Sequence, residues 1–163
     1  MQDMLITDFS TPVFQNAFRK YFAELGINVQ DWDGLFREMT FEGGNRAFVR
    51  MDANETVVGF IMFKNEKLSN WFFEENIGFI REFWVCEEFR NNGHGSCLLR
   101  LAEEYFLGNG IRKAVLTTAT AERFYEKHSY FRDDSYTAKN GDAVFIKHLA
   151  SCMKENNTNG KYI

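Results

Sequence analysis

The stretch of residues 90–96 constrains the possible fold of this chain more than any other stretch. It places Gly93 and Gly95, which are separated by one residue, between a strand-like pattern and a helix-like pattern. It follows an apolar, strand-like run at residues 79–85 and opens into a segment whose apolar residues recur at helical spacing. Glycine accepts positive φ and lets the backbone approach a ligand closely. The first amides of a helix lack intrahelical partners, and the helix dipole adds positive charge there. The stretch therefore predicts an anion site, with Arg90 as an additional donor.

Two familiar nucleotide-binding loops do not fit this stretch. A dinucleotide-binding loop would have a third glycine at position 98, where this chain has Leu98. A triphosphate-binding loop would end in Gly-Lys-Ser or Gly-Lys-Thr, and the sequence contains no such run. The glycine spacing alone thus leaves an anion site and a simple tight turn as the two interpretations.

The composition favours one globular domain. The chain has 163 residues, of which 45% are hydrophobic, and a single proline. We predict one domain over residues 1–150 and a frayed tail over residues 151–163, which are polar and rich in asparagine. Charged side chains interrupt the apolar runs, and the N-terminus has no basic region followed by an apolar stretch, so we predict no membrane anchor and no secretion.

The net charge and the cysteine spacing limit which binding partners and which cellular compartment the sequence predicts. A net charge of −4 provides no basic footprint for nucleic acid, so no nucleic-acid partner is predicted. Cys86, Cys97 and Cys152 have neither a paired nor a metal-type spacing, which favours free thiols in a reducing cytoplasm.

Periodicity predicts the elements before residue 65. Residues 5–9 are predicted as a strand, and a helix is predicted from Pro12, capped by Thr11. A second helix is predicted from Asp31, followed by strands at residues 46–52 and 56–64 that form a hairpin. The strand at residues 56–64 has apolar or small residues on both alternating faces, which predicts a central position in a sheet.

The segments after residue 64 are predicted in the same way. Residues 65–76 are a connection of undefined form, and the helix after the glycine stretch is predicted to end near Gly108. A strand at residues 114–118, a short helix at 121–128 and a final strand at 143–149 complete the pattern.

This order of elements, together with two motifs, resembles the GNAT superfamily of acetyl-CoA-dependent N-acyltransferases. Residues 85–95, which contain Arg-x-x-Gly-x-Gly, look like its cofactor motif, and residues 121–131, which contain Phe-Tyr-Glu-Lys, look like its second motif. The chain departs from the family in having Ser129 and Tyr130 where Gly-Phe is usual, so that turn must form without its preferred glycine. Thr118 stands near the place where many members have asparagine.

The resemblance implies an α/β (α+β) single-domain fold with a mixed, mostly antiparallel sheet of about six to seven strands, splayed at the cofactor site and flanked by about four helices. It implies acetyl-CoA as the co-substrate, with pantetheine paired to the strand before the loop and pyrophosphate on the loop itself. It implies no metal, and the three histidines show no metal-ligand spacing. The residues implied to bind the cofactor are Phe83, Trp84, Val85, Arg90, Asn91, Asn92, Gly93, His94, Gly95, Ser96 and Thr118.

The resemblance also implies two catalytic residues, each with a structural alternative. Tyr125 matches the tyrosine that protonates the departing thiolate, and its alternative is a packed aromatic on an amphipathic helix. Glu82 matches an acidic position that serves as base in some members, and its alternative is a structural carboxylate or one that only orients the amine. Cys86 and Cys97 are expected to be packed thiols rather than nucleophiles, because no motif supplies them with a partner.

The implied function is N-acetylation of an amine on a small molecule by direct attack on the thioester. Acetylation of a protein or peptide is the alternative within the same chemistry, and a non-catalytic acyl-CoA-binding sensor is the alternative of another class. No membrane partner is predicted, and a homodimer built on a sheet edge or an aromatic surface is a further candidate.

Overall fold

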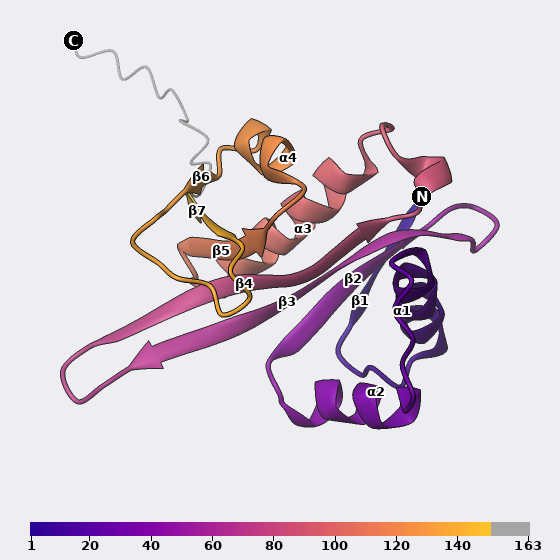
Figure 1. The fold of residues 1–163 in the computed structure, drawn as a ribbon, viewed down its shortest axis with the longest axis horizontal. Helices are drawn as coiled ribbons and strands as arrows, with labels where there is room; N and C mark the ends of the chain where they lie inside the picture. Colours follow the sequence, from indigo (N-terminus) through magenta and orange to yellow (C-terminus); the bar gives the residue numbers. More distant parts are fainter. Residues whose placement is uncertain (151–163) are drawn as a thin grey trace, which may run out of the picture.

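The computed structural model describes residues 1–150, in which one mixed sheet of seven strands is covered by four α-helices (Figure 1). The strand order is β1-β2-β3-β4-β5-β7-β6, and every neighbouring pair is antiparallel except β4 and β5. The predicted fold class is confirmed, whereas the predicted tail at residues 151–163 lies outside the described residues. The strands are β1 (Gln2–Ile6), β2 (Asn45–Met51), β3 (Val57–Ser69), β4 (Glu74–Val85), β5 (Lys113–Thr118), β6 (Phe131–Arg132) and β7 (Ala143–His148). The helices are α1 (Pro12–Glu24), α2 (Trp32–Phe41), α3 (His94–Gly108) and α4 (Glu122–Lys127), with a 3-10 turn at Glu87–Phe89.

Two apolar cores lie on opposite faces of the sheet. On one face α1 and α2 pack Phe18 and Phe36 against Phe60 of β3. On the other face α3 and α4 pack against the sheet, where the rings of Phe63 and Phe106 meet edge to face with their centroids 5.2 Å apart. Figure 1 shows the two helix pairs on the two sides of the strands. The aromatic residues of the sequence thus mostly fill core.

The central position of β3 is confirmed, because residues 57–63 are all buried. The undefined segment at residues 65–76 is the far half of the β3–β4 hairpin, which projects beyond the other strands (Figure 1). Its tip carries Trp71 and Phe72, which are 97% and 98% exposed. The hairpin therefore presents bare aromatic rings to its surroundings.

The structure corrects two details near the N-terminus. The first strand is β1, which ends at Ile6, because the Asp8 carboxylate accepts the Ser10 amide and turns the chain there. Thr11 does not cap α1 with its side chain, since its hydroxyl donates to the Asp8 carbonyl. Asp31 does cap α2, because its carboxylate accepts the Gly34 amide at 2.8 Å.

A bulge and a split in the sheet create the central cavity. Met62 pairs with Glu82 but Phe63 pairs with Ile80, so Arg81 is an extra residue in β4. Beyond the bulge β4 stays paired with β3 but not with β5, because it pairs with β5 only through residues 78 and 79. The two parallel strands therefore diverge at the position where the sequence resemblance implied a splay.

Candidate active site

The glycine stretch turns the chain into α3 through two left-handed residues. Asn91 has φ +62° and Gly93 has φ +77°, a region that asparagine and glycine enter most easily. The first hydrogen bond of α3 runs from the Cys97 amide to the Gly93 carbonyl. Within residues 1–150 no hydrogen bond occupies the amides of residues 94–96, which stand at the positive end of a 15-residue helix.

A hollow of about 380 Å³, here called the loop hollow, lies over these amides. It is bounded by the glycine stretch on one side and by α4 on the other, where Phe124, Lys127 and His128 contribute. A Cβ on Gly95 would stand 3.4 Å from the Phe124 ring, which is van der Waals contact, so the glycine stretch and α4 lie close together here. Free amides, a helix N-terminus and the Lys127 ammonium suit a phosphate group. The predicted residues that line the loop hollow are Val85, Arg90, Asn91, Gly93, His94, Gly95 and Ser96.

Two predicted residues, Arg90 and Asn92, form hydrogen bonds that hold the shape of the loop, and of the two only Arg90 also lines the hollow. The Arg90 guanidinium donates to the Val85 carbonyl at 2.9 Å and to the Glu24 carboxylate at 2.7 Å. The Asn92 side chain donates to the carbonyls of Phe89 and Arg90 and does not line the hollow. Arg90 is thus already partnered by a carboxylate from α1, a partner that the sequence pattern gave no reason to expect.

Trp84 is placed differently from its neighbours in β4. Its ring is 6% exposed within the core of α1 and α2, and its indole N–H donates to the Glu24 carboxylate. Its side chain therefore lies on the sheet face opposite α3 and lines neither the loop hollow nor the space where β4 and β5 diverge. Any contact of Trp84 with a ligand on the opposite face has to be made by its backbone.

A second space of about 410 Å³, the splay cavity, fills the divergence of β4 and β5. It brings together Glu82, Phe83, Thr118 and Tyr125, which the sequence analysis had singled out on separate segments. It also contains Tyr21 from α1, which the sequence analysis had assigned only to an apolar helical stripe. The remaining polar lining includes residues 117, 120, 140 and 142.

Glu82 is half-buried, and its carboxylate accepts a hydrogen bond from the Tyr21 hydroxyl at 2.8 Å. Burial raises the pKa of Glu82, while the Tyr21 hydrogen bond and the charge of Arg81 act in the opposite direction. Arg81 itself is paired with the Glu42 carboxylate at 2.6 Å. Burial, followed by the nearby Glu82 charge, raises the pKa of Tyr21, which therefore stays a hydrogen-bond donor.

Tyr125 is 6% exposed and its ring lies 6.5 Å from that of Phe83. Burial raises the pKa of Tyr125, so its hydroxyl carries a proton throughout the physiological range. The helix that holds it is fixed at both ends: the Thr118 hydroxyl accepts the Ala121 amide, and Ser129 takes φ +65°. Serine thus occupies the left-handed turn that glycine usually fills.

Other chemically active groups lie outside the splay cavity. Cys86 and Cys97 are free thiols, and neither lines it. Burial raises the pKa of Cys86, which disfavours the thiolate. Within residues 1–150 no group of three or more histidine, cysteine or acidic side chains could hold a metal ion. No α-helix in that range is long and apolar enough to cross a membrane.

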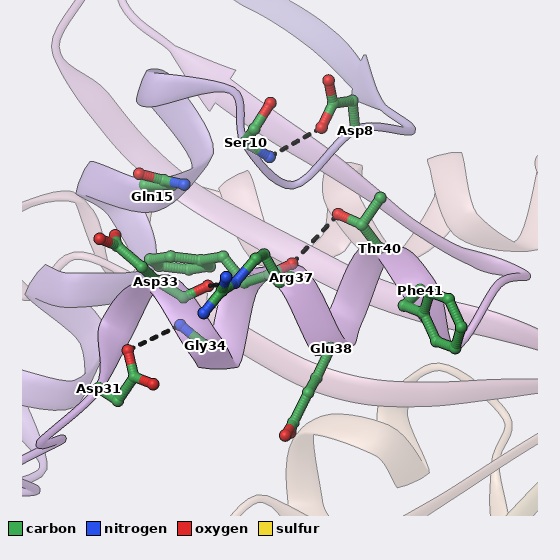
Figure 2. A pocket seen from close by; sticks show the side chains of 11 residues that line it. Asp8, Ser10, Gln15, Asp31, Asp33, Gly34, Arg37, Glu38, Thr40 and Phe41 are labelled. Atoms are coloured by element: carbon green, nitrogen blue, oxygen red, sulfur yellow. Dashed lines mark hydrogen bonds between the residues drawn. The ribbon is translucent and has the colours of Figure 1, made fainter.

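Figure 2 shows a wider hollow of about 840 Å³ between the start of α1 and α2. None of the predicted site residues lines it. Two of its four carboxylates are used locally, since Asp8 accepts the Ser10 amide and Asp31 caps α2. The Thr40 hydroxyl likewise donates to a carbonyl of its own helix. Size alone therefore does not single out this hollow, and the two predicted catalytic residues line the splay cavity instead.

A glycine loop that opens into a helix beside a split sheet, with a carboxylate and a tyrosine in the split, is the arrangement that the sequence resemblance implied for a coenzyme A-dependent acyltransferase. The chain belongs to the acetyltransferase (GNAT) family, whose model matches residues 6–130. It is an acetyl-CoA-dependent acetyltransferase. No curated protein sequence matches the chain.

Solved structures share the fold at low sequence identity. An aminoglycoside 6'-N-acetyltransferase complexed with coenzyme A matches with a TM-score of 0.69 and 17% identity, over 92% of this chain and 98% of that one. Arabidopsis thaliana NAA60 in complex with acetyl-CoA matches with a TM-score of 0.66 and 15% identity, over 91% and 98%. Tetrahymena GCN5 matches with a TM-score of 0.68 and 11% identity, over 92% and 97%.

Proposed function

We propose that the chain acetylates a primary amine on a small molecule, with Glu82 as general base and Tyr125 as general acid. The observation that carries this proposal is that both side chains line the splay cavity, next to the amides that begin α3. Bound acetyl-CoA would supply the thioester carbon that the amine attacks.

The residues of the loop hollow suit the pyrophosphate of the co-substrate. The amides of residues 94–96 and the Lys127 ammonium would bind its oxygens. The backbone of Phe83 and Val85 would pair with the pantetheine arm where β4 no longer pairs with β5. The Val85 carbonyl already accepts from Arg90, but a carbonyl has a second lone pair for this purpose. The bulge at Arg81 would aim a β4 amide at the thioester carbonyl, and such a donor contributes about 3 to 4 kcal/mol.

Glu82 would receive the proton that the amine must lose. An alkyl ammonium has a pKa of about 10 and is almost fully protonated at neutral pH, so it cannot attack as it stands. The carboxylates of Glu82 and Asp142 both line the splay cavity and would attract the cation. Glu82 would take the proton directly or through a water, while the Tyr21 hydroxyl holds its carboxylate in place.

Tyr125 would complete the transfer. As the new N–C bond forms, the C–S bond breaks and its electron pair leaves on sulfur. The Tyr125 hydroxyl is neutral because burial raises its pKa, and it can give its proton to the thiolate. Its hydroxyl is not committed to another group, since no hydrogen bond from it is formed within residues 1–150.

The test measures thiol release with acetyl-CoA and a panel of amines, together with acetyl-CoA affinity by calorimetry. Tyr125→Phe should lower kcat at least tenfold and leave the Kd for acetyl-CoA nearly unchanged. Full activity in this variant would remove Tyr125 from the mechanism. Binding of acetyl-CoA without thiol release across the whole panel would favour a sensor over an enzyme of this kind.

A further inference from the structure

A second depression opens beside the splay cavity, and we call it the apolar trough. It has a volume of about 630 Å³ and runs over β4, β5 and β7. Its floor is hydrocarbon from Ile77, Phe79, Val115 and Val144. None of the helices formed by residues 1–150 covers it; its outer wall is the connection between β6 and β7, from which Tyr136 and Ala138 contribute. Apolar walls of this kind favour an apolar occupant.

The apolar trough is continuous with the place of acetyl transfer. Thr117 and Asn140 line both the trough and the splay cavity. Because of the bulge at Arg81, Ile77 before it and Glu82 after it both point to the sheet face opposite α3. A molecule whose amine reaches Glu82 can therefore lie along the trough without crossing the sheet.

Two lysines, Lys113 and Lys139, line the trough, and within residues 1–150 no carboxylate does. The Lys113 ammonium pairs with the Glu75 carboxylate at 2.6 Å and lies over the Tyr136 ring. The Asn140 side chain donates to the Asp142 carboxylate at 2.8 Å, which keeps that carboxylate at the splay end. If an acceptor carried a second cation, that charge would have to move from water to the apolar walls of the trough, and this transfer is unfavourable.

We infer, resting on the proposed function, that the acceptor is a primary amine that carries an apolar substituent such as an aryl or alkyl group. Its ammonium lies between Glu82 and Asp142 in the splay cavity, and its substituent lies in the apolar trough. The same chemistry is offered by a free aralkylamine and by a peptide with an apolar N-terminal residue. Polyamines and aminoglycosides, which carry several charges, are disfavoured.

The first experiment compares kcat/KM by thiol release for ethylamine, butylamine, hexylamine, 2-phenylethylamine and spermidine. Each buried methylene contributes about 0.8 kcal/mol, so kcat/KM should rise about fourfold per methylene until the trough is filled. Peptides that begin with phenylalanine or serine form a separate arm. A phenylalanine peptide that surpasses 2-phenylethylamine identifies a peptide as the source of the apolar group, and the reverse order identifies a small molecule.

The second experiment fills the trough. Ala138 is half-buried on the wall outside the strands, so Ala138→Trp should occupy the space without breaking the sheet. We expect at least a tenfold loss of kcat/KM for 2-phenylethylamine, with ethylamine turnover and acetyl-CoA Kd unchanged. Ala53→Trp is the control, since Ala53 lies in the β2–β3 turn and lines neither space. Tyr136→Ser, which removes an exposed part of the wall, should reduce the preference for 2-phenylethylamine even if Ala138→Trp fails to fold.

The experiments distinguish a failure of the inference about the acceptor from a failure of the proposed function. Thiol release that does not increase with apolar length, or that is highest with spermidine, would overturn the inference and leave the acetyltransferase mechanism standing. An equal loss for ethylamine and 2-phenylethylamine in Ala138→Trp would also overturn it. Absence of release with every amine, despite acetyl-CoA binding, would instead overturn the proposed function.

Discussion

Tyr21→Phe tests the base assignment through a single oxygen atom. The Tyr21 ring packs against Phe18 and Phe60 with centroids 5.9 and 5.6 Å apart, and phenylalanine retains these contacts. The hydroxyl that is lost is the one that donates to the Glu82 carboxylate at 2.8 Å. The substitution therefore changes the environment of Glu82 with little change in packing.

The expected size of the effect follows from the two protonation states of Glu82. A hydrogen bond to a charged group contributes about 1.5 to 3 kcal/mol net, and one to a neutral group about 0.5 to 1.5 kcal/mol. Loss of the difference, about 1 to 1.5 kcal/mol, corresponds to about one pKa unit. Because the Tyr21 bond lowers the pKa of Glu82, its removal raises that pKa further. The base works deprotonated, so the acidic limb of kcat/KM should move about one unit to higher pH.

The assay is thiol release at limiting amine, measured from about pH 5 to about pH 9 to cover both limbs of the profile. Tyr105→Phe is the matched control, because Tyr105 is a half-buried helical tyrosine that lies outside the splay cavity. An acidic limb that stays in place in Tyr21→Phe, or moves to lower pH, would refute the assignment of Glu82 as the titrating base.

Three further predictions concern substitutions of Glu82, of Gly93 in the glycine loop and of Lys127 in α4. Glu82→Gln should nearly abolish turnover yet raise Tm at alkaline pH. Burial raises the pKa of Glu82, so the stability of the native protein falls as the pH rises from 4.5 through the raised pKa, and glutamine avoids this loss. The gain in Tm should vanish in acid, and a pH-independent difference between the two proteins would contradict this account. Gly93→Asp should raise the Kd for acetyl-CoA at least tenfold by calorimetry, because it places a negative charge beside the helix amides. Gly110→Asp is its control, because Gly110 has a similar φ of +76° and equally open space, beyond the end of α3. Equal Kd values for acetyl-CoA in the two variants would refute the phosphate site at the start of α3. Lys127→Ala should weaken acetyl-CoA binding and make the remaining affinity less sensitive to salt, and an unchanged Kd would remove Lys127 from the loop hollow.

Much of the fold could be predicted because its signals are local. The glycines at the start of α3, the two-sided apolar pattern of β3 and the beginning of a helix at Asp31 each depend on neighbouring residues, and all three appear in the structure. The two-residue strand β6 was missed, since a pattern that short carries no periodicity. The hairpin of residues 65–76 was undefined because its pairing depends on strand partners rather than on its own sequence.

The motifs brought candidate site residues into view from the sequence, whereas contacts between residues far apart in the chain could not be predicted. Tyr21 and Glu82 are 61 positions apart, and nothing in an apolar helical stripe tells which member will reach across to a strand. Glu24 was missed for the same reason, although it holds both Trp84 and Arg90. Lys127 lay within the recognised second motif, but only the packing of α4 beside the glycine loop shows that it lines the loop hollow.

The bulge at Arg81 determines to which face of the sheet each later side chain of β4 points. Ile80 and Phe83 both pack on the α3 side although they are an odd number of residues apart, and Glu82 consequently faces α1. In a strand without the extra residue, every side chain after it would change faces. The carboxylate would then point into the core under α3, and the Trp84 ring would lie at the cofactor face. In this chain the length of β4 is therefore under stricter constraint than the identity of Arg81, since deleting one residue would exchange the proposed acceptor and cofactor faces without removing either proposed catalytic group.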